Sequence, residues 1–286
     1  MSHYISDDLG RVIVEIGGEG GLVTREFNAY GEVSEEHSYA YELDEAEAML
    51  LLDAADPDQY LSGLESVEDR KVRSLYDDEG RLIYQVTLAN GVTDEGVVGK
   101  NRYDAFGNIV ETIAYADMVR YSLNVTREQL SQSLAQLDLN LDNRKMQMVH
   151  DKANQLRFSI THVDGTQANI KEIRYDAFGN DIESIEYDER DISSFSGQPS
   201  ADELSSAVSA TYDSQTDRKT AKSFDSANNN ITLTDAEGHT ERNEYDAFGN
   251  RTLFENKLGH QWRYEYDLKD RLTTEYIPIS HWTTVI

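Results

Sequence analysis

The fold is decided by the hexapeptide Tyr-Asp-Ala-Phe-Gly-Asn at residues 103–108, which recurs letter for letter at residues 175–180 and 245–250. Looser copies bring the total to nine, and they begin at Ser6, Phe27, Tyr76, His150, Phe224 and Tyr266. Three of the steps from one copy to the next, 6 to 27, 224 to 245 and 245 to 266, are each 21 residues long. Self-similarity at a short, fixed period is the sequence signature of a repeat protein.

Two positions of each copy hold the residue types that a tight turn requires. The fifth position is glycine in six copies and Asn154, Asn228 or Asp270 in the others, and these types best tolerate a left-handed backbone. The second position is always Asp or Asn, whose side chain accepts a hydrogen bond from backbone two residues further on. We therefore expect a turn with positive φ in every copy and assign these aspartates to the turn, not to catalysis. In the three identical copies the structural repeat residues are Tyr103, Asp104, Gly107, Tyr175, Asp176, Gly179, Tyr245, Asp246 and Gly249.

The stretches between the turns alternate apolar and polar residues, as half-buried β-strands do. Leu82, Tyr84 and Val86, for example, share one face of residues 81–87. A second glycine follows several copy starts after 14 or 15 residues, at Gly20, Gly91, Gly165, Gly238 and Gly259. Each copy therefore predicts two strands and two turns. We expect the aromatic residue at the first position to stack on its equivalent in the next hairpin.

Longer steps after the copies that begin at Phe27, Tyr103 and Tyr175 leave room for insertions at about 43–68, 117–142 and 188–216. Each insertion contains a pair with the spacing of a helical capping box, namely Asp44 with Glu47, Thr126 with Gln129, and Ser200 with Glu203. Short apolar stripes at helical spacing follow these pairs. The pattern predicts a short helix in each insertion.

A basic pair follows each expected helix, although cations are scarce in this chain. The pairs are Arg70 and Lys71, Arg144 and Lys145, and Arg218 and Lys219. We expect them to neutralise the carboxylate-rich turns at which the chain re-enters the sheet. The functional alternative is a ladder of sites that bind anions.

Composition excludes several classes of function. The chain has 26 Lys and Arg against 54 Asp and Glu, and its net charge of −28 repels nucleic acid and anionic bilayers. It has no cysteine, which excludes disulfides, thiolate metal sites and cysteine nucleophiles. The first residues lack a basic flank and an apolar run, and no stretch of about 18 apolar residues occurs, so neither a signal peptide nor membrane insertion is predicted.

No catalytic, cofactor or metal site is predicted. The sequence lacks G-x-S-x-G, G-x-x-x-x-G-K-[ST] and H-E-x-x-H, and the glycine-rich residues 17–21 are not followed by a helix pattern. His239 and His260 occupy the same repeat position, which favours a structural role over a metal ladder. Calcium at carboxylate-rich turns such as residues 77–79 is the alternative to no cofactor, although the spacing matches no EF-hand loop.

The Tyr-Asp-x-x-Gly copies, together with Gly-His at residues 238–239 and 259–260, resemble the rearrangement-hotspot (RHS) or YD-repeat family. The resemblance runs from Ser6 to about Leu272. It implies a mainly β fold, a spiral or curved sheet of YD-repeat hairpins with short helical insertions, as one continuous array over residues 1–286. In that family the sheet can close into a shell, as in the B and C components of Tc toxins, where it encloses a toxic C-terminal domain.

The resemblance implies a non-enzymatic structural segment of a larger secreted or cell-surface RHS protein, forming part of a shell or scaffold around a toxin, as in polymorphic toxins. Its partners would be the remainder of that protein and a C-terminal toxin domain. The alternative is an adhesin-like module that binds a glycan or a cell-surface protein. The one Asp-Pro, at residues 56–57, does not match the self-cleavage motif of the family, so no processing site is predicted. Because repeats lie close to both ends, we expect a fragment of a larger protein.

Overall fold

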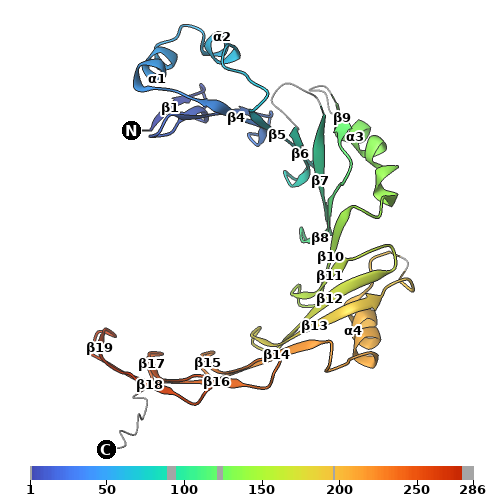
Figure 1. Ribbon diagram of the computed structural model, residues 1–286, viewed down its shortest axis with the longest axis vertical. Coiled ribbons are helices and arrows are strands. Elements are labelled where there is room, and N and C mark those ends of the chain that lie inside the picture. The colour runs from blue at the N-terminus through green and yellow to red at the C-terminus, as the bar shows by residue number, and fades with distance from the viewer. Residues whose placement is uncertain (1, 89–94, 121–124, 196, 279–286) are drawn as a thin grey trace, which may run out of the picture. The chain divides into compact units, whose positions relative to one another are not determined.

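The chain is mostly β-structure. In the computed structural model, which describes residues 2–88, 95–120, 125–195 and 197–278, nineteen strands join by antiparallel pairing into one sheet (Figure 1). The prediction of a mainly β fold with short helical insertions is confirmed. The chain divides into two compact units, Met1–Gln147 and Met148–Ile286; the first contains two buried cores and the second contains one.

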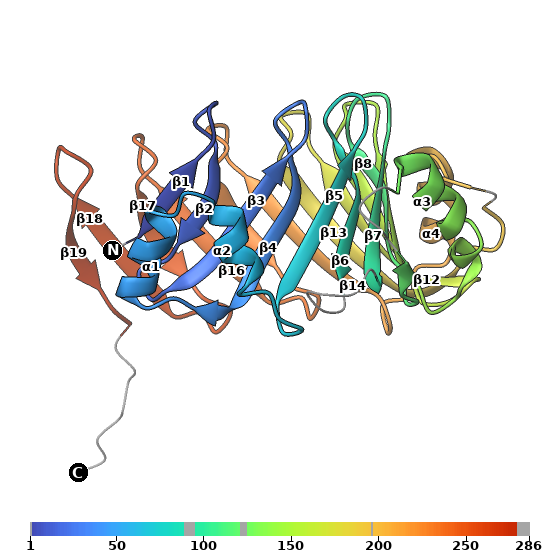
Figure 2. The ribbon, with the colours of Figure 1, turned by 90° about the horizontal axis from the view of Figure 1, so that it is seen from above.

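The N-terminal unit begins with two hairpins and then alternates hairpins with helical insertions. Its strands are β1 (His3–Ser6), β2 (Val12–Ile16), β3 (Gly21–Phe27), β4 (Val33–Glu42), β5 (Arg70–Tyr76), β6 (Leu82–Leu88), β7 (Glu95–Tyr103), β8 (Ile109–Ala114) and β9 (Val119–Arg120). Its helices are α1 (Glu45–Leu52), α2 (Pro57–Ser62), α3 (Arg127–Leu134) and the single-turn η1 (Leu137–Leu139). Figure 2 shows α1 and α2 lying over the strands β1 to β4.

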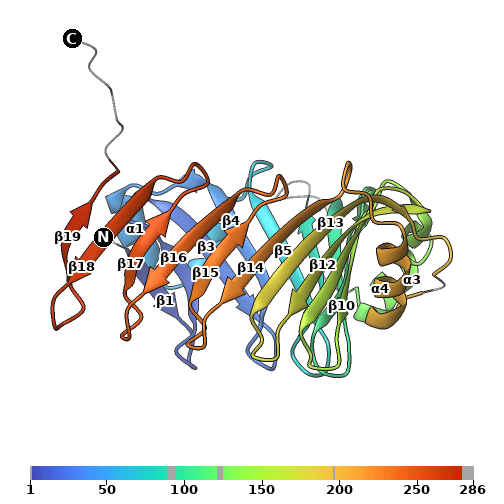
Figure 3. The same cartoon turned by 90° about the horizontal axis from the view of Figure 1, so that it is seen from below.

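The C-terminal unit contains one helix and the longest run of uninterrupted hairpins. The strand β10 (Arg144–His150) contains the boundary between the units and is followed by β11 (Leu156–His162), β12 (Gln167–Tyr175), β13 (Asp181–Asp191), β14 (Arg218–Phe224), β15 (Asn230–Thr234), β16 (Thr240–Tyr245), β17 (Arg251–Glu255), β18 (Gln261–Tyr266) and β19 (Leu272–Tyr276). The helix α4 (Ala201–Ala210) lies between β13 and β14 in the chain. Figure 3 shows the strands of this unit side by side.

Strand register places alternate residues on opposite faces of the sheet, as the period of two predicts. In the hairpin of β12 and β13, Ile170 lies opposite Tyr187, and both side chains are buried. Their neighbours Lys171 and Glu186 are also paired in register but point to the other, solvent-exposed face. One face of the C-terminal unit is therefore apolar where α4 covers it, and the other is polar.

Each predicted helix begins at its expected cap. Capping boxes are present at Asp44, Thr126 and Ser200, which satisfy backbone N–H groups that a helix start leaves unpaired. In the C-terminal unit, Leu204 and Val208 of α4 pack on a core that includes Phe158. The remaining buried members of that core are Val149, Ile160, Ala168, Ile170, Ile185 and Tyr187. The insertions thus supply the apolar layer that a single sheet lacks.

The buried face of α4 gives a direct test of this core. Leu204→Ala removes a fully buried side chain and should lower the free energy of unfolding by about 2–5 kcal/mol, because apolar contacts are lost and a cavity remains. The control Leu258→Ala changes a residue that is 81% exposed and should cost less than about 0.5 kcal/mol. Urea unfolding followed by circular dichroism measures both. Equal losses would show that α4 does not pack on the sheet.

Candidate functional site

The turns of the nine copies share one backbone conformation. The residue at the fifth position has a positive φ in every copy, from 57° at Asp270 to 90° at Gly31. Its N–H donates to the carbonyl of the second position, as from Gly179 to Asp176 at 3.2 Å. Glycine avoids the steric strain of this conformation, and Asn and Asp tolerate it. The three identical hexapeptides therefore adopt the same shape, with φ values of 85° at Gly107 and 89° at Gly179 and Gly249.

The Asp or Asn at the second position holds each turn together. Oδ1 of Asp176 accepts from the backbone N–H groups of Phe178 at 2.8 Å and Asn180 at 3.0 Å, and Oδ2 accepts from the Asn180 side chain at 2.9 Å. Asp246 makes the same three bonds at 2.9, 2.9 and 3.1 Å. The asparagine side chain, with the backbone donors, holds the pKa of both carboxyl groups below the ordinary value.

Two of the second glycines belong to turns of the same kind. Gly238 and Gly259 have φ values of 85° and 79°, and the side chains of Asp235 and Asn256 accept the corresponding backbone bonds. Gly20 closes a turn with the same backbone bonds. Gly165 does not have positive φ, and Gly91 lies outside the described residues.

The first-position tyrosine, present in five copies, joins its copy to the one before it. In five copies its hydroxyl donates to the carbonyl of the seventh position of the preceding copy. The pairs are Tyr76 with Val33, Tyr103 with Leu82 and Tyr175 with Leu156 at 2.9 Å, and Tyr245 with Asn230 and Tyr266 with Arg251 at 3.1 Å. The contact joins the same two repeat positions in both compact units.

The prediction that these aromatic residues stack on one another is wrong. Among the described residues, no ring contact joins two first-position aromatics. The hydroxyl holds the ring against the preceding hairpin, and an arginine can cover its face, as Arg81 does over Tyr103 at 4.9 Å. In the copy that begins at Phe27, which has no hydroxyl, Arg11 lies 4.5 Å from the ring centre. Cation–π contact and a backbone hydrogen bond thus replace stacking.

Successive turns also touch through the sixth position. The Asn180 side chain donates to Asn228 Oδ1 at 3.0 Å, and that of Asn250 donates to Asp270 Oδ1 at 2.9 Å. A Cβ atom added at Gly80 would lie 2.8 Å from Oε1 of Glu32, the sixth residue of the preceding copy. The fifth position is therefore constrained by its neighbour as well as by its own φ.

Each insertion is closed by an Asp or Asn that the sequence analysis did not single out. Oδ1 of Asp69, Asn143 and Asp217 accepts from the backbone N–H of Ala40, Ala116 and Asp188, at 2.8, 3.0 and 3.2 Å respectively. The three acceptors all lie seven residues before the next copy, directly before the basic pair, and this shared spacing is the signal that could have identified them. Asp69 and Asp217 fasten the end of the insertion to the strand that precedes it, and Asn143 fastens it to a residue just after that strand.

The basic pairs behave in two ways. Arg218 lies 3.6 Å from Glu237, which belongs to the turn between β15 and β16 and not to the turn at which the chain re-enters the sheet. The lysines instead pair with strand or loop carboxylates, as Lys145 does with Glu111 at 3.0 Å. Lys145 and Lys219 lie in returning strands, where their partners Glu111 and Glu183 belong to the adjacent strand. Lys71 instead pairs at 3.0 Å with Glu65, in the loop just before β5.

A fully buried carboxylate, Glu172, lies beneath the C-terminal sheet. It accepts from Nη2 of Arg157 at 2.7 Å, from Nε of Arg174 at 3.0 Å and from the hydroxyl of Tyr187 at 2.7 Å. Burial, together with the bond to Glu172, raises the pKa of Tyr187, so that this tyrosine remains a donor. Both carboxylate oxygens of Glu172 accept hydrogen bonds from these protein donors, so the arrangement stabilises the packing of the sheet.

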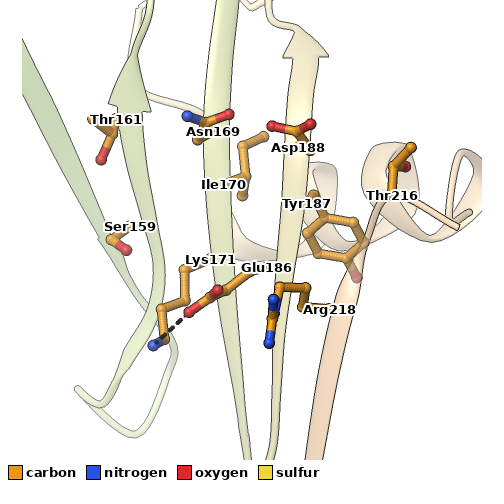
Figure 4. Close-up of a pocket in the computed structure, with 10 residues that line it drawn as sticks. All are labelled: Ser159, Thr161, Asn169, Ile170, Lys171, Glu186, Tyr187, Asp188, Thr216 and Arg218. Carbon is orange, nitrogen blue, oxygen red and sulfur yellow. Dashed lines mark hydrogen bonds and ion pairs between the residues drawn. The ribbon is translucent and has the colours of Figure 1, made fainter. Parts of the chain in front are cut away.

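A polar groove crosses β11, β12 and β13 and reaches the start of β14 in the same unit (Figure 4). Its volume is about 480 Å³. It is lined by Ser159, Thr161, Asn169, Ile170, Lys171, Glu186, Tyr187, Asp188, Thr216 and Arg218. Lys171 Nζ lies 3.2 Å from Glu186 Oε1. Hydroxyl, amide and charged groups suit a ligand that makes hydrogen bonds, and no histidine is among the lining residues.

The described residues contain no group of three or more His, Asp or Glu side chains placed to hold a metal ion. Their helices are also too short or too polar to cross a membrane.

No protein-family model matches the chain, and no curated protein matches it. Among solved structures, the crystal structures of TcdB2-TccC3-Cdc42 and of TcdB2-TccC3 align with 96% of this chain, at 13% and 15% sequence identity and a TM-score of 0.45. The Photorhabdus luminescens Tc holotoxin pore aligns with 96% of this chain at 13% identity and a TM-score of 0.28. The chain spans only 13%, 13% and 16% of the length of those chains.

The tyrosine contact predicts the effect of losing a single hydroxyl. Tyr175→Phe should lower the free energy of unfolding by about 0.5–1.5 kcal/mol, because the Leu156 carbonyl loses its donor. The control Tyr30→Phe removes the hydroxyl of a turn residue that is 88% exposed and should have almost no effect. Urea unfolding at neutral pH compares the two variants. A Tyr175→Phe variant as stable as the control would contradict a structural role for this bond.

The lowered pKa values of the turn aspartates predict how stability depends on pH. A carboxyl group whose pKa is lower in the folded chain contributes stability that is present above its unfolded value, near 3.8, and is lost as pH falls through its folded value. The triple variant D176N/D225N/D246N keeps the Oδ1 acceptors but cannot titrate. Urea unfolding from about pH 5 down to about pH 2 should show a shallower loss for this variant than for the wild type. Parallel curves would contradict the assignment.

Proposed function

We propose that the chain is a non-enzymatic structural repeat segment of a larger secreted or cell-surface protein of RHS type, in which it forms part of a shell or scaffold. One observation carries the proposal, namely the tyrosine contact that recurs in five copies with the same register. Because five copies make this contact between the same two positions, a further copy could be added to the array with the same geometry. The cargo that the RHS resemblance favours is a toxin domain of the same larger protein.

The hydrogen bonds that the carboxylates accept from other groups of the protein support a structural role over an enzymatic one. The turn aspartates use both oxygens in bonds within the turn, as Asp176 and Asp246 do. Glu172 is occupied by two arginines and a tyrosine, and both oxygens of Asp217 accept from Arg190 at 2.6 Å. A general acid or base needs a carboxyl group that reaches a substrate. These groups are held by protein donors instead.

The last strand of the C-terminal unit supports extension of the array. Within this unit β19 pairs with β18. Its first residue, Leu272, is the seventh residue of the copy that begins at Tyr266, and this is the position whose carbonyl accepts a tyrosine hydroxyl in earlier copies. A further repeat with a first-position tyrosine would find its acceptor there. We therefore propose that another segment of the larger protein docks on β19.

Self-association of the isolated chain tests this proposal, because an unpaired edge strand pairs readily with other chains. Sedimentation should show association that rises with concentration. Leu272→Lys places a charge on the edge strand and should weaken this association by about tenfold, whereas the control Leu139→Lys changes a side chain that is 81% exposed on η1 and should not. A wild-type chain that stays monomeric, or equal effects of both variants, would contradict the proposal.

The polar groove favours a second candidate, the adhesin-like module. Its hydroxyl, amide and charged side chains match the hydrogen-bonding groups of a sugar. A glycan array separates the two candidates, since the scaffold predicts no selective glycan. Selective binding that is lost in Lys171→Ala and kept in Lys269→Ala, which removes a lysine at a turn outside the groove, would favour the adhesin.

A further inference from the structure

Phenylalanine occupies the fourth position of the three identical turns, and its ring projects into solvent. Phe106, Phe178 and Phe248 are 83%, 81% and 82% exposed. Tyr30 and Leu9 hold the same position in two other copies and are also exposed. Single exposed apolar residues are common and need no explanation. A large apolar side chain at one repeat position, exposed each time, is not a scattered occurrence.

The turn itself does not require this side chain. Phe178 contributes its backbone N–H to Asp176 at 2.8 Å. Ala153 and Ala227 stand at the same position in other copies and donate the same bond to the aspartate at 2.8 Å. Alanine is therefore sufficient for the turn. A phenylalanine ring left in water gains no burial, so its presence points to a role outside the fold.

The two phenylalanine turns of the C-terminal unit lie in one row at the ends of its strands. The hairpin connections from β12 to β13, β14 to β15, β16 to β17 and β18 to β19 all fall at this same end of the sheet (Figure 3). Phe178 and Phe248 are four strands apart, which at about 4.8 Å per strand is roughly 19 Å. The exposed Leu268 lies two strands further along. We call Phe178, Phe248 and Leu268 the apolar rim.

Negative charge accompanies the rings of the apolar rim. In the copies with arginine at the sixth position, that arginine pairs with the turn aspartate, as Arg271 does with Asp267 at 2.6 Å. In the phenylalanine turns the sixth residue is Asn180 or Asn250, which bonds to the aspartate without neutralising it. The described residues show no ion pair to Asp176 or Asp246. The hydrogen bonds to these carboxylates keep them ionised at neutral pH.

We propose that the apolar rim is a docking surface for a basic, amphipathic peptide segment of another protein. Apolar side chains of the segment would contact Phe178 and Phe248, and lysine or arginine would lie beside Asp176 and Asp246. A second copy of this chain is poorly matched to the rim itself, because the rim carboxylates call for a basic partner and this chain has 26 Lys and Arg against 54 Asp and Glu. The inference goes beyond the proposed scaffold and does not depend on it, because it names a binding partner for the row of turns and not for the edge strand β19.

The spacing of the rings defines the segment. An extended chain rises about 3.3 Å per residue, so the roughly 19 Å between Phe178 and Phe248 corresponds to apolar residues about six apart. Lysines between them would lie beside the carboxylates of Asp176 and Asp246 and pass over Asp225, in the turn between the two. A suitable probe is a fluorescein-labelled peptide of about 14 residues, with two phenylalanines six apart and lysines between them. A scrambled peptide of the same composition controls for net charge.

Fluorescence anisotropy in about 50 mM salt tests the proposal, with the double variant F178S/F248S as the main comparison. The double variant should bind the probe about tenfold more weakly than the wild type. The matched control Leu258→Ser changes an equally exposed turn residue at the opposite edge and should bind within about twofold of the wild type. Because alanine suffices at the fourth position, urea unfolding midpoints of the variants should equal that of the wild type.

Three results would overturn the proposal. The first is equal binding by the wild type and F178S/F248S, or no preference over the scrambled peptide. The second is a loss in Leu258→Ser as large as in the double variant. The third is no binding of the probe with binding instead to phosphatidylcholine vesicles that F178S/F248S abolishes, which would assign the rim to a lipid surface.

Discussion

A hydrogen bond from a tyrosine hydroxyl to the backbone of the preceding hairpin joins five of the repeats to the one before them. The bond runs from the hydroxyl at the first position of one copy to the carbonyl at the seventh position of the preceding copy, at 2.9–3.1 Å in five copies. One such bond contributes only about 0.5–1.5 kcal/mol. The array therefore depends on its repetition, and on turns whose shape makes each repetition the same. Stability of this kind is a sum of similar neighbour contacts.

The insertions supply what a single sheet cannot. A sheet alone has no second apolar layer, so each helix brings residues such as Leu130 or Leu204 onto one face. The Asp or Asn at the end of each insertion, Asp217 for example, then fastens the chain to the strand before it. This leaves the other face of the C-terminal sheet polar, as at Lys171 and Glu186.

Local features could be predicted from the sequence, and contacts between distant segments could not. Turn conformation and helix caps depend on residues within a few positions of each other. Asp176 with Gly179 therefore predicts a turn, and Ser200 with Glu203 predicts a helix cap. The tyrosine hydroxyl donates to a backbone carbonyl, on residues as different as Val33, Leu82 and Arg251. Because every residue has such a carbonyl, the residue type at this position does not identify the acceptor. That is why stacking was expected where a hydrogen bond is found. The groove was likewise hidden, because its lining comes from residues spread over several strands.

The central claim is that this tyrosine couples neighbouring hairpins, and hydrogen–deuterium exchange tests it most directly. In a Tyr245→Phe variant, backbone amides of the preceding hairpin, residues 218–234, should exchange faster together with those of residues 240–255, while those of residues 156–175 keep the rate of the wild type. Faster exchange confined to residues 240–255 would contradict the claim, because the bond would then stabilise its own hairpin alone.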